Sequence, residues 1–114
     1  MRYNKEVTIS IDDFKKAEIR IGTVLSAERV PETDKLLRLE VDVGEGQPRQ
    51  ILSGIAEHVR PEDLVGRQFP FLTNLQPRVI RGLASNGMLL AVGEGDTFAL
   101  LSPTKAVDDG SYIR

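Results

Sequence analysis

The feature that most constrains the fold is the alternation of apolar and polar residues in short segments. In LLRLEVDVG (residues 36–44), a leucine or valine occupies every second position from Leu37 onward, with charged side chains between. This period of two is typical of a strand with one buried face. AEIRIGTVLSAERV (residues 17–30) alternates similarly and predicts a half-buried strand, in which mid-strand Gly22 indicates a bend or bulge. Its apolar face contains Ile19, Ile21, Thr23 and Leu25.

Breaks between such segments define the order of the remaining elements. Further strands are expected at residues 49–55, 67–75, 87–92 and 97–103. Pro70 makes 67–75 an edge or bulged strand, because proline cannot donate to a ladder. RPEDLVG (residues 60–66) predicts one helical turn, and Ser10 predicts the N-cap of another short helix. This order predicts an all-β fold, a five-stranded OB-fold barrel with a short helix between strands 3 and 4. Periodicity alone leaves other small β-barrels open.

Length and composition indicate one globular domain. The chain has 114 residues, and 15 Lys and Arg against 17 Asp and Glu give a formal net charge of -2. That balance does not suggest a strongly basic nucleic-acid binder. Without cysteine, a disulfide framework and a thiolate site are both excluded. No apolar run approaches the roughly 20 residues of a membrane span, and the N-terminus has no signal-peptide core. We expect a cytoplasmic protein without a membrane partner.

The charges are unevenly distributed along the chain. Residues 64–93 contain no Asp or Glu, yet they hold Arg67, Arg78 and Arg81. Clustering of this kind can create a positive patch on an acidic protein. The alternative is that a mostly extended segment simply carries few charges.

Catalytic motifs are absent from the sequence. His58 is the one histidine, and without cysteine it does not indicate a zinc site. Ser53 and Ser85 lie outside any G-x-S-x-G elbow, and no Walker A loop occurs. We therefore expect no enzyme activity, metal or cofactor. Aromatic residues are also few, which argues against a stacking platform for single strands and favours backbone and shape contacts.

Five sequence blocks occur in a fixed order between Phe14 and Ala91: FKKAEIRIGTV, ETDKLLRLEVDVG, RQILSGI, RPEDLVGR and NLQPRVIRGLASNGMLLA. Each is weak alone. Together, and ending in N-L-x-P-R-x-x-R-G-x-x-S-x-G-M, they resemble the tRNA-binding domain family. That family includes the C-terminal domain of bacterial methionyl-tRNA synthetases, free-standing structure-specific tRNA-binding proteins and CsaA-like chaperones.

The resemblance implies an OB-fold with C-terminal additions, usually in a homodimer. We expect a single domain over residues 1–114, with a core at about 14–92 and an extension at 93–114 that contacts a second copy. The implied function is non-catalytic binding of tRNA by shape, at the outer corner of the molecule. The domain would act alone or as a trans-acting appendage of methionyl-tRNA synthetase. Alternatives are a CsaA-like protein-binding chaperone and a dimerisation module.

Carried over by position, the resemblance places tRNA contacts at Lys35, Asn74, Arg78, Arg81, Ser85 and Met88. The lysine and the two arginines, which we expect on loops, would bind phosphates. The asparagine would hydrogen-bond a sugar or phosphate, the serine would contact backbone, and the methionine would pack against ribose or base. Each also has an ordinary interpretation, as a turn residue, a solubilising charge or part of the strand core.

Two positions depart from the family pattern. Val79 stands where members often carry a lysine, and one phosphate contact fewer would lower affinity and flatten the salt dependence. Ala84 stands where an acid is common, which removes a repulsion.

The C-terminal segment TFALLSPTKAVDDGSYIR (residues 97–114) is the expected dimer surface, joined by the N-terminal segment. Its apolar residues exceed what the interior of a small barrel needs. They are Phe98, Leu100, Leu101 and Ile113.

Overall fold

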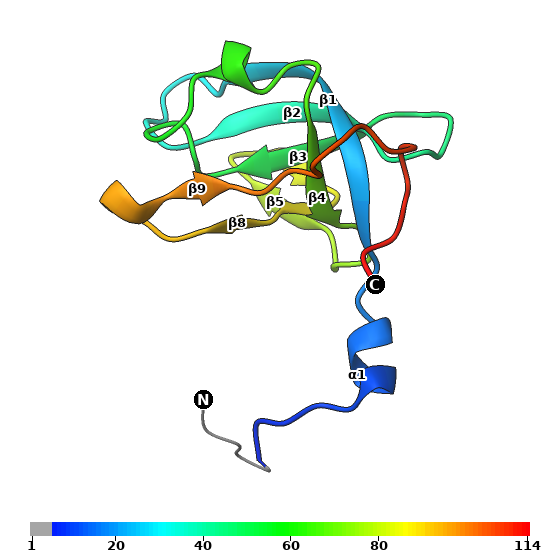
Figure 1. Cartoon of the computed structure of the whole chain (residues 1–114). Coiled ribbons are helices and arrows are strands. Elements are labelled where there is room, and N and C mark those ends of the chain that lie inside the picture. Colours follow the sequence, from blue (N-terminus) through cyan, green and yellow to red (C-terminus); the bar gives the residue numbers. More distant parts are fainter. Residues whose placement is uncertain (1–5) are drawn as a thin grey trace.

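Five antiparallel strands form the body of the fold in the computed structural model, which describes residues 6–114. They are β1 (Ile19–Arg29), β2 (Leu37–Asp42), β3 (Arg49–Ser53), β4 (Gln68–Leu72) and β7 (Met88–Leu89). They pair in the order β3-β2-β1-β4-β7 (Figure 1). The ends of this order meet where the Asn86 N–H donates to the Gln50 carbonyl at 2.9 Å. The predicted all-β, OB-like barrel is therefore confirmed.

Two hairpins and three short helical segments complete the described part of the chain. β5 (Arg78–Ile80) pairs with β6 (Leu83–Ser85), and β8 (Ala91–Val92) pairs with β9 (Ala99–Leu100). The turn predicted between strands 3 and 4 is the 3₁₀ turn η1 (Pro61–Asp63), and η2 (Gly95–Thr97) joins β8 to β9. Helix α1 (Ile11–Lys15) begins at the predicted N-cap Ser10 and projects from the barrel (Figure 1). No helix within residues 6–114 is long and apolar enough to cross a membrane.

The prediction for Pro70 was wrong, because β4 lies between β1 and β7 rather than at an edge. Ile21 is opposite Pro70 in β1 and donates its N–H to the Ser111 carbonyl at 2.8 Å, away from β4. In an antiparallel ladder, Pro70 therefore also directs its backbone away from β1, so its missing N–H removes no bond there. The predicted strand 87–92 is interrupted at Leu90, beyond which β8 pairs with β9.

The apolar face expected to be buried in β1 is not the face that lines the barrel. Val24 and Gly22 point inward, whereas Leu25 is 49% exposed. Ile21 faces outward and is 6% exposed, and its backbone pairs with residues 110–113, which hydrogen-bond along the edge of β1 that β2 does not reach. The expected irregularity is a register shift between Val24 and Ser26, slightly beyond the glycine. The C-terminal segment thus satisfies the backbone groups of β1 beside the outer isoleucines.

The core confirms the alternation in β2, whose Leu37, Leu39 and Val41 are fully buried. They pack with aromatic side chains of β4, Phe69 and Phe71, which have no solvent exposure. Burying side chains of this kind contributes roughly 1.5–3 kcal/mol each relative to exposure. Because side chains fill the barrel, a ligand must bind on its outer surface.

A cluster of three charged side chains joins one end of the barrel. Glu45, in the loop after β2, accepts hydrogen bonds from Arg20 and Arg49, each at 2.5 Å. Arg49 also donates to the carbonyls of Thr73 (2.6 Å) and Asn86 (3.0 Å). Hydrogen bonding to Arg49, with a smaller contribution from Arg20, lowers the pKa of Glu45 from 4.5 to about 2 against the opposing effect of burial. The cluster therefore links β1, β3, the end of β4 and the turn before β7.

Gly22→Ala should destabilise the fold. A Cβ at this position would lie 2.7 Å from Val43 Cγ1 and 2.9 Å from the Asp42 carbonyl oxygen, and overpacking of this kind costs about 1–3 kcal/mol. Gly54→Ala is the matched control, because its methyl group would meet no atom within 4 Å. Urea denaturation should show a lower unfolding free energy for Gly22→Ala alone. Equal stabilities would contradict the close packing described for β1.

The cluster of Glu45, Arg20 and Arg49 should make the free energy of unfolding depend on pH in the acidic range. Since the pKa of Glu45 is depressed in the folded protein, its contribution is complete above its ordinary pKa of 4.5 and disappears as pH falls toward about 2. We expect wild type to be more stable than Glu45→Gln at pH 6, with the difference shrinking over that window. Denaturation at pH 6, 4 and 2.5 measures this, and a difference independent of pH would contradict the ion pairing.

Candidate nucleic-acid interface

The β5–β6 hairpin presents the two arginines that the sequence singled out. Its connection consists of Arg81 and Gly82, both with positive φ (53° and 77°). Positive φ at both central residues is the signature of a type I′ turn, in which Asn-Gly is the common pair. A non-glycine residue in this region is strained, and such strain clusters at functional sites. The segment was expected to be a loop; its folding as a hairpin fixes Arg81 at an exposed tip.

Ser85 fixes the hairpin to the barrel. It is 5% exposed, and its hydroxyl accepts from the Leu52 N–H at 3.0 Å and donates to the Gly87 carbonyl at 3.1 Å. The neighbouring Ala84 carbonyl accepts from the Gln50 amide at 2.9 Å. The hydroxyl predicted to contact tRNA is thus occupied within the chain. In β5, the residue directly opposite Ser85 is Arg78, so this attachment also determines where Arg78 lies.

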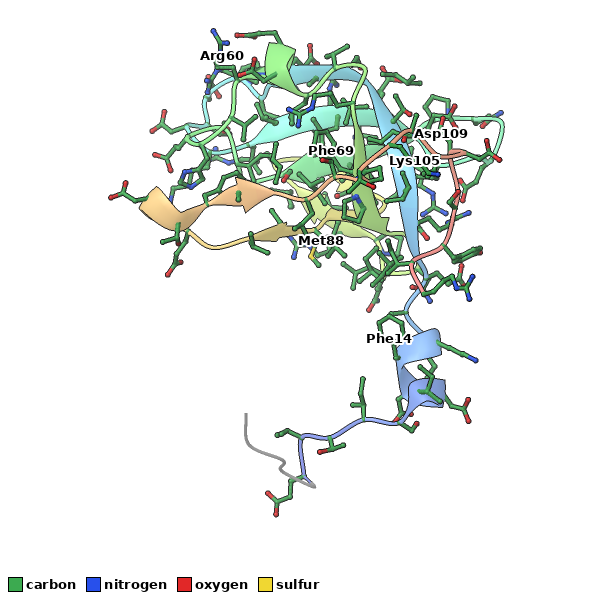
Figure 2. All side chains as sticks on the ribbon, in the orientation of Figure 1. Phe14, Arg60, Phe69, Met88, Lys105 and Asp109 are labelled. Atoms are coloured by element: carbon green, nitrogen blue, oxygen red, sulfur yellow. The ribbon has the colours of Figure 1, made fainter. Side chains whose placement is uncertain are left out.

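A groove of about 250 Å³ is lined by residues of β3, β7, this hairpin and the segment before it. Three of the six predicted contact residues line it, namely Arg78, Ser85 and Met88. Met88 is 41% exposed and lies on the side of the barrel below β4 in the view of Figure 2. We refer to this feature as the β3–β7 groove. Its lining is Leu52, Ser53, Gly54, Leu75, Gln76, Arg78, Ser85, Gly87, Met88 and Leu89.

Lys35 lies in the loop between β1 and β2, beside the segment that follows β3. Pro31 and Glu32 form a turn closed by the Thr33 N–H donating to the Val30 carbonyl, with positive φ (65°) at Glu32. The Ala56 N–H donates to the Lys35 carbonyl at 2.9 Å. The backbone of Lys35 is therefore bonded to Ala56, two residues after Gly54, which lines the groove.

Asn74 is placed differently. Its side-chain oxygen accepts from the Glu18 N–H at 2.8 Å, and its amide donates to the Lys16 carbonyl at 2.6 Å. These bonds tie the end of β4 to the segment between α1 and β1. The structure therefore does not bring the Asn74 side chain into the groove, although the next residues, Leu75 and Gln76, line it.

The cations of this region lack ion-pair partners among the described residues. Within residues 6–114, no carboxylate lies within 4.0 Å of Lys35, Arg78 or Arg81, whereas Arg38, Arg49 and Arg60 form ion pairs. Residues 64–93 also carry no acid, so no carboxylate adjoins the hairpin along the chain. Arg67, the third arginine of that segment, lies over the Phe69 ring and lines other pockets. The predicted patch therefore contains Arg78 and Arg81 but not Arg67.

Sequence reasoning missed one residue that shapes the groove. Arg49 holds the carbonyls of Thr73 and Asn86 together, and its only signal was its place in the RQILSGI block. At Gly87, a Cβ would approach Ile51 Cδ1 to 2.9 Å and the Leu72 carbonyl oxygen to 3.1 Å. The close approach of the turn before β7 to the barrel therefore requires glycine at this position.

The described residues contain no group of three or more metal-ligating side chains. His58 stacks on Phe98 with ring centroids 4.7 Å apart. The surface thus offers a small, partly apolar groove lined by Arg78, with Arg81 at the tip of the same hairpin, and these cations suit a phosphate-bearing ligand.

The family model described as "Putative tRNA binding domain" matches residues 19–112. The chain is 52% identical over 110 residues to the methionine–tRNA ligase of Methanoregula boonei, covering 96% of this chain and 16% of that enzyme. It thus spans about a sixth of the length of the curated ligases it matches.

Two solved structures match over nearly their whole length. A MetRS related protein from Pyrococcus horikoshii has a TM-score of 0.87 at 34% identity, covering 94% of this chain and 98% of that chain. The chaperone CsaA of Bacillus anthracis has a TM-score of 0.83 at 33% identity, covering 95% and 100%. With a family match across most of its length, this chain belongs to the tRNA-binding domain family.

Proposed function

We propose that the domain binds the outer corner of tRNA without catalysis, using the rim of the β3–β7 groove. The observation that carries this proposal is a groove lined by Arg78, which has no ion-pair partner among residues 6–114, in a chain of the tRNA-binding family. Arg81 lies at the tip of the same hairpin, and the Lys35 carbonyl is bonded to the segment after β3, so both can add charge beside the groove. Guanidinium forks suit phosphate oxygens, and the lysine adds a mobile point charge. Contacts to phosphate position a folded RNA without reading its sequence.

The six predicted residues divide into two roles in this proposal. Lys35, Arg78, Arg81 and Met88 contact tRNA, because their side chains are exposed. Asn74 and Ser85 act indirectly, since their hydrogen bonds to backbone groups hold the end of β4 and the hairpin in place.

Curated relatives are methionine–tRNA ligases, which supports a role beside such an enzyme. The domain would act alone or as a trans-acting appendage of methionyl-tRNA synthetase, adding affinity for tRNA while the synthetase supplies the chemistry. A tRNA ligand also supports a cytoplasmic location.

A homodimer is part of the proposal, with a surface narrower than the one expected from the sequence. Phe98 and Leu100 pack against the core of their own chain, which leaves less of β9 for a partner. A second groove, of about 470 Å³, lies between α1 and the C-terminal residues. It includes the exposed Ile11 and Ile113 together with Phe14. We propose that a second copy covers this groove.

The CsaA likeness supports protein binding as the second candidate. In that case the ligand would be an unfolded segment, and affinity would depend on apolar surface rather than on the arginines.

Replacing the hairpin arginines should weaken tRNA binding and its salt dependence together. Arg81→Asn removes the charge while placing a favoured residue in the type I′ turn, and Arg78→Gln keeps length and polarity. Filter retention of tRNA across a salt series should show a slope reduced by roughly 0.7–0.9 for each phosphate that the variant no longer neutralises. Arg81→Asn should be at least as stable as wild type.

Lys105→Gln is the control for charge alone, because Lys105 lies on the C-terminal segment and lines a separate pocket. Its slope should match wild type. Equal reductions for Lys105→Gln and the hairpin variants would argue for nonspecific attraction. Peptide binding that survives in Arg78→Gln/Arg81→Asn, with no tRNA binding by wild type, would favour the chaperone function.

Ile113→Asp should separate the dimer. Light scattering of wild type at micromolar concentration should give twice the 12.6 kDa chain mass, and the variant should give one. Val92→Asp introduces the same charge at another exposed apolar residue and should remain dimeric. A monomeric wild type would contradict the proposed surface.

A further inference from the structure

The β3–β7 groove is lined by both apolar and polar side chains, and phosphate contacts alone do not explain the apolar ones. Four of the side chains that line it are apolar. Leu52 and Leu89 are nearly buried, whereas Leu75 and Met88 are partly exposed. The other side chains that line it are polar: Ser53, Gln76, Arg78 and Ser85. A surface for phosphates alone would need cations and amide donors but no apolar side chains.

Two of the polar side chains are unused. Neither the Ser53 hydroxyl nor the Gln76 amide makes a hydrogen bond to another group in residues 6–114, whereas both bonds of Ser85 are made internally. A free carboxamide offers donors and an acceptor side by side, and a hydroxyl offers both. These donors and acceptors complement the acceptors and donors along the edge of a nucleobase.

The size of the groove limits what it can hold. At about 250 Å³ it is below the roughly 300–1,000 Å³ of pockets for drug-sized ligands, so it suits one flat heterocycle. Met88 can lie against the face of such a ring, because a thioether is polarisable and makes favourable contacts with aromatic groups. Arg78 lines the same groove and carries no ion pair among the described residues, so it can bind the phosphate attached to that base.

We propose that the β3–β7 groove holds a single unstacked nucleobase of tRNA, with Met88 against its face, Gln76 and Ser53 at its edge, and Arg78 on the adjoining phosphate. The inference rests on the proposed function and adds a base-binding site to it. RNA loops present splayed bases in this way, and proteins recognise them by stacking and edge hydrogen bonds. An apolar peptide side chain suits the groove less well, because half of its lining side chains are polar.

Gly54 provides the test. It lines the groove, a Cβ there meets no atom within 4 Å, and its φ is not positive. Gly54→Leu should therefore occupy the groove without disturbing the barrel or removing any charge, and Gly54→Ala should leave most of the space. Denaturation of both variants verifies the fold. Gln76→Ala, which removes the edge hydrogen bonds without filling the groove, is the second variant.

We expect Gly54→Leu to bind tRNA about tenfold more weakly than wild type, as removal of a stacked base does, with an unchanged salt slope. Gln76→Ala should bind several-fold more weakly, and Gly54→Ala nearly as well as wild type. Nucleoside 5′-monophosphates titrated into wild type should shift the amide resonances of Gly54 and Gly87 and the Gln76 side chain, and Gly54→Leu should abolish the shifts.

Wild-type affinity for tRNA in Gly54→Leu and Gln76→Ala would overturn the base site. The tRNA affinity of the Arg78 and Arg81 variants would still test the proposed function independently. A reduced salt slope in Gly54→Leu would show a displaced phosphate and would also count against it. If Gly54→Leu weakened the binding of unfolded peptides but not of tRNA, the groove would be a peptide site. No binding of tRNA by wild type would overturn the proposed function and this inference together.

Discussion

The closure of the barrel between β3 and the segment around Ser85 and Gly87 is the contact on which the rest of the surface depends. Few backbone bonds join the two sides, so side chains complete the seam. The Ser85 hydroxyl links the two sides, Gly87 allows the close approach, and Arg49 holds the carbonyls of Thr73 and Asn86. Because the hairpin and β7 flank this seam, a contact that stabilises the barrel also positions the proposed tRNA-binding rim.

The distribution of paired and unpaired cations explains how a protein with a net negative charge can bind a negatively charged ligand. Elsewhere in the described chain many arginines are neutralised by nearby carboxylates, as Arg60 is by Asp63. Exposed pairs of this kind contribute little to stability, but they remove positive charge from the rest of the surface. Within residues 6–114, the arginines of the hairpin carry no such partners. The local field that a phosphate meets is thus set by which cations are left unpaired, rather than by the net charge of -2.

The sequence predicted the barrel because β2 and the core of β4 follow a simple period of two. It failed at β1, where residues on both faces are buried: Val24 in the barrel core and Ile21 on the opposite face, so alternation could not identify the inner face. The β5–β6 hairpin was missed because its strands have three residues each and its turn carries Arg81 rather than asparagine. Contact positions came from family resemblance, and only coordinates could separate exposed Arg78 from Ser85, whose hydroxyl is already used.

The central claim is that tRNA lies on the hairpin and the rim of the β3–β7 groove. Amide hydrogen–deuterium exchange of the intact chain, with and without saturating tRNA, tests it most directly. The account predicts added protection in residues 30–36 and 76–89, with little change in residues 99–109. Protection confined to the C-terminal segment or to α1, with the hairpin unchanged, would contradict it and place the ligand on another face.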